Sequence, residues 1–129
     1  MVMVRVADDD GATGCGYTVM HEGFGGPIAS MVRENFTSWT LQQDPRRIEW
    51  IWRHLWRTHH YVGRGGVASF AISAADIALW DLRCRAMGEP LWRALGGAAR
   101  SCRCYAGGID LAYPLPKVGD LLGSFSYCY

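Results

Sequence analysis

The 129-residue sequence predicts an α+β fold in which an antiparallel β-hairpin packs against a layer of helices. Two β-rich segments separated by a turn open the chain, and segments with apolar residues at helical spacing follow them. Half of the residues are hydrophobic and 19% are charged, which is typical of a globular domain with a real core.

The hairpin is expected at the start of the chain. Residues 1–7 (MVMVRVA) and 14–20 (GCGYTVM) have strand composition, and DDDG between them supplies a turn in which Gly11 can take a positive φ. The following HEGFGG is a glycine-rich loop.

Two helices are expected next. The first begins at Pro27 and carries Ile28 and Phe36 at helical spacing. The second has Asp44 as its predicted N-cap and Pro45 at its first position, where the missing N–H costs nothing. Its apolar stripe comprises Ile48, Ile51, Trp52, Leu55 and Trp56. We interpret its tryptophans, Trp50 included, as core or interface residues.

A third helix is expected from an N-cap at Ser69 to about Met87, where Gly88 ends it. It is apolar nearly all round, which indicates a buried helix packed on more than one side. Pro90 begins a short further helix that ends at the glycines 96 and 97.

Asp76 and Asp81 are the two carboxylates of the third helix. They are five residues apart and therefore about 140° apart around the helix, so they cannot converge on one proton or one metal. Asp81 can reach Arg85 at i+4, and Asp76 shares a flank with Ser73 and Arg83. We therefore interpret both as paired structural carboxylates rather than an acid/base dyad.

One long stretch carries a family resemblance. GRGGVASFAISAADIALWDLRCRAMGEPLWRALGG contains the ordered run A-I-S-A-x-D-I-A-L-W-D, then G-x-P-L from Gly88 to Leu91, then L-G-G from Leu95 to Gly97. It resembles the N-terminal capping domain of the enolase superfamily, in the branch of mandelate racemase and muconate lactonizing enzyme. The resemblance covers roughly residues 1–115.

The resemblance implies a capping domain at residues 1–100, without its usual first strand, placed over a modified (β/α) barrel. CRCYAGG is similar to the first strand of that barrel, so residues 101–129 are expected to hold this strand and an atypical tail. In this family a base removes the proton α to a carboxylate, and Mg²⁺ stabilises the enediolate. The lysine pair, the metal carboxylates and the histidine-aspartate base lie on later strands, so neither catalytic nor metal residues are expected in this chain.

The end of the sequence departs from the family pattern. After DLAYPLPK the family continues with a helix and the lysine-bearing strand, whereas this chain reads VGDLLGSFSYCY. We expect a truncated or frame-shifted gene product.

Substrate-binding residues are expected on loops of the capping domain. The resemblance places a specificity loop near MHEGFGG, which makes His21, Glu22 and Phe24 candidates, with a solvated turn as the alternative. Arg64 can face an acidic substrate or remain a surface charge. Asp110 follows the predicted barrel strand, at the end where barrel active sites assemble.

Charge and hydropathy restrict the partners. A net charge of +1 argues against nucleic acid, and no apolar run reaches the roughly 18 residues of a membrane span. Five cysteines without a C-x-x-C pair and the absence of a signal-peptide pattern favour a cytoplasmic protein.

The first function expected is the N-terminal part of a Mg²⁺-dependent enzyme acting on a small carboxylate or acid sugar. An acid-sugar dehydratase is the first candidate for the enzyme class, and a racemase or cycloisomerase is the second. The full-length protein is expected to be a homo-oligomer, and this chain alone to be inactive. The alternative is a non-catalytic binding or oligomerisation module.

Overall fold

The computed structural model describes residues 1–20, 23–41, 43–97 and 101. The chain divides after Gly97 into two units, and the first, Met1–Gly97, contains all the described helices and strands. The predicted barrel strand and tail, residues 101–129, lie outside the described residues except for Ser101. None of the described helices has the length and apolarity needed to cross a membrane.

The N-terminal hairpin is confirmed. Strand β1 (Val2–Ala7) pairs antiparallel with β2 (Thr13–Thr18), with Val2 opposite Thr18 and Ala7 opposite Thr13. At the turn, the Asp8 carboxylate accepts the Ala12 N–H at 2.7 Å, and Gly11 has the expected positive φ of 89°. The turn sequence therefore sets the register of the hairpin.

The segment after the hairpin is helical but not a uniform α-helix. It consists of α1 (Gly25–Ser30), a π-helical segment η1 (Met31–Phe36) and α2 (Thr37–Thr40). The Thr37 hydroxyl donates to the Val32 carbonyl at 3.1 Å, one residue further back than α-helical bonding would place its partner. Ile28, Met31 and Phe36 from this segment are buried.

The predicted start of the second helix is wrong. Helix α3 is Ile48–Thr58, so Asp44 and Pro45 precede it. The Asp44 carboxylate accepts the Arg46 N–H at 2.9 Å and the Arg46 guanidinium at 3.0 Å. These hydrogen bonds hold the pKa of Asp44 below its usual value. Because the Asp44 carboxylate is bonded to Arg46, two residues further along the chain, it closes a turn and does not cap α3.

The apolar stripe of α3 is narrower than predicted. Ile48, Ile51 and Leu55 are buried, whereas Trp52 stays 36% exposed. Trp52 stacks on Trp56 with ring centroids 5.2 Å apart, so it covers the edge of the core and does not enter it. Trp50 is 39% exposed and therefore lies outside the core, which leaves the interface alternative of its prediction untested.

Helix α4 (Gly66–Met87) is longer at its start than predicted, because Gly65 and not Ser69 is its N-cap. Its end is confirmed: Gly88 has φ 63°, and its N–H bonds back to the Arg85 carbonyl at 3.1 Å. The short helix after Pro90 is α5 (Leu91–Ala94).

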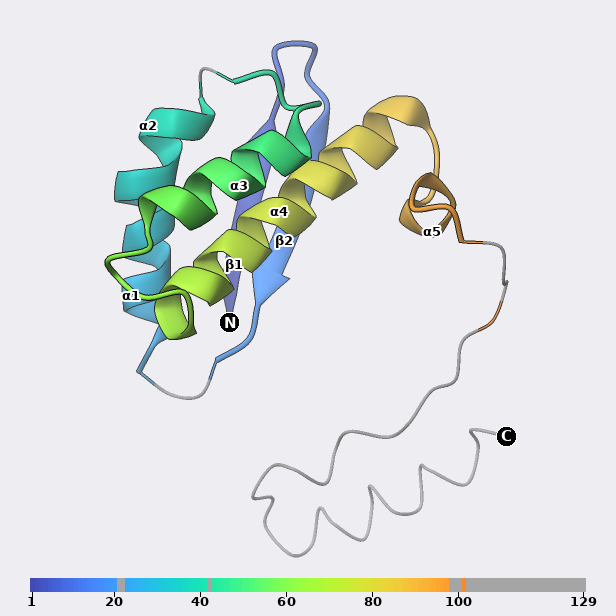
Figure 1. Ribbon diagram of the computed structural model, residues 1–129. Helices are drawn as coiled ribbons and strands as arrows, with labels where there is room; N and C mark the ends of the chain where they lie inside the picture. Colours follow the sequence, from blue (N-terminus) through green and yellow to red (C-terminus); the bar gives the residue numbers. More distant parts are fainter. Residues whose placement is uncertain (21–22, 42, 98–100, 102–129) are drawn as a thin grey trace, which may run out of the picture. The chain divides into compact units, whose positions relative to one another are not determined.

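Helix α4 lies between the hairpin and the other helices (Figure 1). Ala74 and Ala78 pack against the sheet, while Ile72 and Leu79 belong to the core cluster shared with α1, η1 and α3. The predicted packing on more than one side is confirmed. Phe70, 38% exposed, marks the face that neither layer covers.

Candidate functional site

The two loops that hold Phe24 and Arg64 lie at one end of the domain. Figure 1 shows the connection from β2 to α1 and the connection from α3 to α4 at the end where α4 begins. The hairpin turn lies at the opposite end. Of the five predicted site residues, Phe24 and Arg64 are described, and His21, Glu22 and Asp110 lie outside the described residues.

Phe24 occupies the N-cap position of α1, and its carbonyl accepts the Ile28 N–H at 3.4 Å. Its side chain is 51% exposed and so is not committed to the core. A large apolar ring held half-exposed at a helix start can contact a ligand without the helix having to move.

Arg64 lies on the exposed loop between α3 and α4, with its guanidinium carbon 5.7 Å from the centroid of the Trp56 ring. Contact with the indole face orients an arginine without neutralising its charge. Gly63 and Gly66 flank it with φ values of 103° and 55°. This arrangement presents a positive charge suited to a carboxylate ligand.

Tyr61 lies in the same loop and is 92% exposed, and it was not among the residues predicted from the sequence. Its ring centroid lies 4.0 Å from that of His60, whose Nδ1 contacts the Arg57 carbonyl at 2.8 Å. His59 Nδ1 contacts the Leu55 carbonyl at 2.8 Å in the same way. The sequence feature that could have identified Tyr61 is its position as an aromatic residue directly before a glycine-rich loop, in YVGRGG.

The two α4 carboxylates lie apart, as predicted, but only one of them is paired. Asp81 Oδ2 accepts hydrogen bonds from Arg85 Nε at 2.8 Å and from the Cys15 N–H at 2.9 Å. Asp76 has no hydrogen bond or ion pair with any described residue, so its predicted pairing is wrong. Partial burial raises the pKa of Asp76, because the charged form loses hydration without gaining a partner.

We expect Asp76→Asn to stabilise the domain at neutral pH by no more than about 1 kcal/mol, since part of the carboxyl remains in water. The raised pKa of Asp76 means that folding favours the protonated form. The stability that the protonated Asp76 side chain allows is therefore fully present at acid pH. It is lost as the pH rises through the pKa that Asp76 has in the folded protein. Urea unfolding of both proteins from pH 3 to pH 7 tests this; a difference in stability between variant and wild type that stays the same from pH 3 to pH 7 would contradict it.

The described residues do not fit a magnesium site. No three His, Cys, Asp or Glu side chains within this part of the chain come together in a way that could hold a metal ion. Mg²⁺ needs several oxygen ligands around one position.

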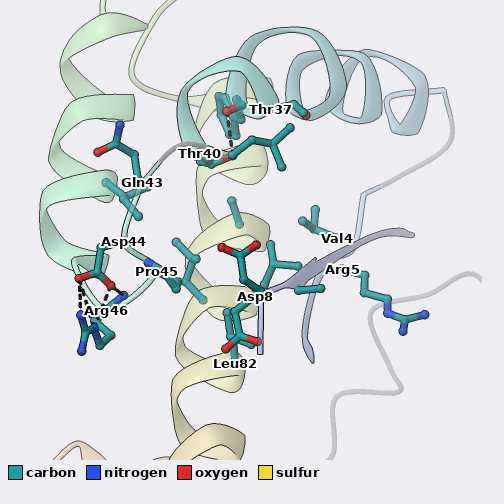
Figure 2. Close-up of a pocket in the computed structure, with 18 of the residues that line it drawn as sticks. Val4, Arg5, Asp8, Thr37, Thr40, Gln43, Asp44, Pro45, Arg46 and Leu82 are labelled. Atoms are coloured by element: carbon teal, nitrogen blue, oxygen red, sulfur yellow. Dashed lines mark hydrogen bonds and ion pairs between the residues drawn. The ribbon is translucent and has the colours of Figure 1, made fainter. Parts of the chain in front are cut away.

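A groove of about 740 Å³ lies away from these loops and reaches the hairpin turn. Its lining includes β1, the Asp8–Asp10 turn, α2 and one side of α4. Figure 2 shows Val4 and Arg5 on one side of α4 and the Asp44–Arg46 pair on the other. Of the predicted substrate residues that the structure describes, neither Phe24 nor Arg64 lines the groove.

A two-stranded antiparallel hairpin packed on a long buried helix that also contacts further helices defines an α+β domain. The profile of the mandelate racemase / muconate lactonizing enzyme N-terminal domain matches residues 1–96. This chain belongs to that family. The predicted family and α+β capping fold are thereby confirmed.

Several characterised proteins are similar to the chain. A 3,6-anhydro-alpha-L-galactonate cycloisomerase of Streptomyces coelicolor is 46% identical over 115 residues, 89% of this chain and 32% of that protein. A D-galactonate dehydratase family member of Pseudarthrobacter chlorophenolicus is 36% identical, over 85% of this chain and 27% of that protein. The chain thus spans about a third of the length of these relatives.

The solved structures agree with this assignment. A racemase from Streptomyces coelicolor A3(2) with bound magnesium superposes with a TM-score of 0.85 at 44% identity, covering 95% of this chain and 37% of that one. A Paracoccus denitrificans mandelate racemase/muconate lactonizing protein complexed with magnesium gives 0.78 at 28% identity, covering 95% and 33%.

Proposed function

We propose that this chain is the N-terminal capping portion of a Mg²⁺-dependent enolase-superfamily enzyme that removes the proton α to the carboxylate of an acid sugar. The observation that carries the proposal is the match of residues 1–96 to the family domain. The names of the similar proteins supply the substrate class, because they include a 3,6-anhydro-alpha-L-galactonate cycloisomerase, a D-galactonate dehydratase family member and a D-mannonate dehydratase.

Cycloisomerisation and dehydration are the two candidate reactions. The 46% identity to the cycloisomerase, against 36% and 33% for the first dehydratases, favours cycloisomerisation. The sequence alone favoured dehydration, so the proposal reverses that order. Both reactions begin with the same abstraction of an α-proton, and they differ in which group leaves or adds afterwards.

The chain's own part in this proposal is to close over the substrate. Arg64 would attract the substrate carboxylate, and Phe24 would exclude water beside it. We include His21, Glu22 and Asp110 as further substrate contacts on the basis of the family resemblance. Mg²⁺ would be held by a barrel and not by the described residues, and no step of the reaction is assigned to this chain.

We expect the purified 129-residue chain to show no exchange of the substrate α-hydrogen with solvent deuterium, with or without Mg²⁺. The reason is that the family's base and metal ligands lie on the barrel. Proton NMR of galactonate, mannonate and 3,6-anhydrogalactonate in deuterated water measures this. Exchange above the protein-free rate would contradict it, whereas a soluble dimer without exchange and without any barrel-coding continuation would favour the alternative module.

The genomic DNA downstream of codon 117 provides the positive test. We expect a continuation, in some reading frame, that encodes K-x-K and spaced metal carboxylates. In an enzyme restored from that continuation, Arg64→Met should raise KM about tenfold or more with little change in kcat, since it removes one charge-assisted contact. The matched control is Arg53→Met on the outer face of α3, where the arginine pairs with Glu49 at 2.6 Å. Equal KM values for the two variants would show that Arg64 does not contact the substrate.

A further inference from the structure

Arg64 contacts an indole and not a carboxylate of the described chain. The ion pairs among the described residues use Arg46, Arg53 and Arg85, and Arg64 takes no part in them. Its guanidinium carbon lies 5.7 Å from the centroid of the Trp56 ring. A contact with the face of an indole uses none of the five guanidinium N–H donors. Arg64 therefore keeps both its charge and its donors for an anionic ligand.

This contact differs from the other arginine–tryptophan contacts of the described chain, because it joins two separate elements. The other three link residues at most three positions apart: Arg47 with Trp50, Arg83 with Trp80, and Arg93 with Trp92. Arg64 and Trp56 are eight positions apart, the first on a loop and the second on α3. Their contact is therefore set by the path of the loop and not by the geometry of one helix.

The backbone of the loop restrains Arg64 only weakly. The last turn before it is closed by the Gly63 N–H, which bonds to the His60 carbonyl at 3.3 Å. Gly63 and Gly65 then flank Arg64, and glycine has more conformational freedom than any other residue. Among the described residues, the contact with Trp56 is thus the restraint that sets the direction of the guanidinium.

Trp52 supports the Trp56 ring. The two residues are about one helical turn apart on α3, and their rings lie nearly parallel, at 12° with centroids 5.2 Å apart. Trp56 also packs against the core cluster, which anchors the pair on the domain. Trp52, Trp56 and Arg64 therefore form a continuous series of contacts from the helix to the loop.

We propose that Trp56, supported by Trp52, is a positioning residue that holds the Arg64 guanidinium ready for the substrate carboxylate. This inference rests on the proposed function, which identifies the carboxylate as that of an acid sugar. An arginine whose direction is set before binding loses less side-chain entropy when it meets its ligand. The set direction also favours a bidentate contact, in which two N–H groups of one guanidinium meet both carboxylate oxygens. Trp56 acts through Arg64 and does not touch the substrate.

The first test measures the contact in the full 129-residue chain by NMR. Protons over the face of an indole resonate upfield, so the Arg64 δ-methylene protons should be shifted upfield and show nuclear Overhauser contacts with the Trp56 ring. Trp56→Leu should remove the shift, and Trp56→Phe should keep part of it. The matched control is Trp50→Leu, which removes the indole 4.6 Å from the Arg47 guanidinium carbon and should leave Arg64 unchanged.

The second test measures KM for the acid sugar in the enzyme restored from the downstream DNA. Trp56→Leu should raise KM about fivefold or more with little change in kcat, and Trp56→Phe should restore most of the loss. In an Arg64→Met background, Trp56→Leu should have no further effect, because the side chain that it positions is then absent. Trp50→Leu should leave KM within about twofold of the unmodified enzyme.

The outcomes separate this inference from the proposed function. Absence of the Overhauser contacts in the unmodified chain overturns the positioning role, even if Trp56→Leu does not fold. Additive effects of Trp56→Leu and Arg64→Met on KM overturn it as well. If Arg64→Met raises KM and Trp56→Leu does not, the positioning role fails and the proposed function stands. If the restored enzyme converts no acid sugar, the proposed function fails and the assigned carboxylate fails with it, whereas the contacts measured in the 129-residue chain are unaffected.

Discussion

Gly16→Ala should unfold the domain or cost about 3 kcal/mol or more in the free energy of unfolding. A Cβ on Gly16 would meet the Ala74 carbonyl oxygen and would lie 2.5 Å from the Ala78 nitrogen. Both are main-chain atoms of α4 and cannot rotate away as a side chain could. The strand would have to move off the helix, which would open the contact between β2 and α4. Urea unfolding followed by circular dichroism measures the loss.

Two further substitutions give this prediction its controls. Gly14→Ala should be comparably severe, because its Cβ would meet the Ala78 carbonyl and lie 2.7 Å from Leu82 Cα. Gly25→Ala should be neutral or stabilise by up to about 1 kcal/mol, since Gly25 begins α1 and its added Cβ would reach only ordinary contact, 3.6 Å from Val2 Cγ2. A loss below about 1 kcal/mol for Gly16→Ala would show that the strand and helix are not in close contact.

This close contact explains why the hairpin and α4 could be predicted separately but not their packing. Turn residues and a left-handed Gly88 are local signals, and both were confirmed. The glycines at 14 and 16 read only as residues of a strand, because their role depends on Ala74 and Ala78, more than fifty residues away. Long-range fit has no signature in one short window of sequence.

The errors at the starts of α3 and α4 have the same origin, because both starts were predicted from residue type alone. Asp44 and Ser69 are good N-cap residue types, yet neither caps a helix. Asp44 is engaged by Arg46, and Gly65 already begins α4 four residues before Ser69. The π-helical segment at 31–36 likewise depends on Phe36 entering the core, which periodicity alone cannot specify.

The candidate site was only partly accessible to sequence reasoning. Arg64 stood out because a charge lies between glycines, and its contact with Trp56 followed from the fold. The pairing of Asp81 with Arg85 was a local i+4 relation and was confirmed. Asp76 had suitable neighbours on the helix, but none of them pairs with it.

Phe36→Ala is expected to cost about 3–5 kcal/mol, a large share of the 5–15 kcal/mol typical of a domain. Phe36 is 1% exposed, and its ring meets that of His59 edge-on with centroids 5.1 Å apart. Removing the ring would leave a cavity under the π-helical segment and would deprive the buried His59 ring of its aromatic contact. Thermal and urea unfolding should both show the loss.

Phe24→Ala is the matched control, because it deletes the same ring from a position that is 51% exposed. We expect Phe24→Ala to lower the free energy of unfolding by less than about 1 kcal/mol. At a half-exposed site, the deleted ring gives up little transfer free energy and leaves no closed cavity. If Phe24 contacts substrate in a full-length enzyme, the same variant should impair KM there while leaving stability nearly intact. Equal destabilisation by the two variants would mean that the core does not centre on Phe36. The pair thus separates a residue that supports the core from one that is proposed to face a ligand.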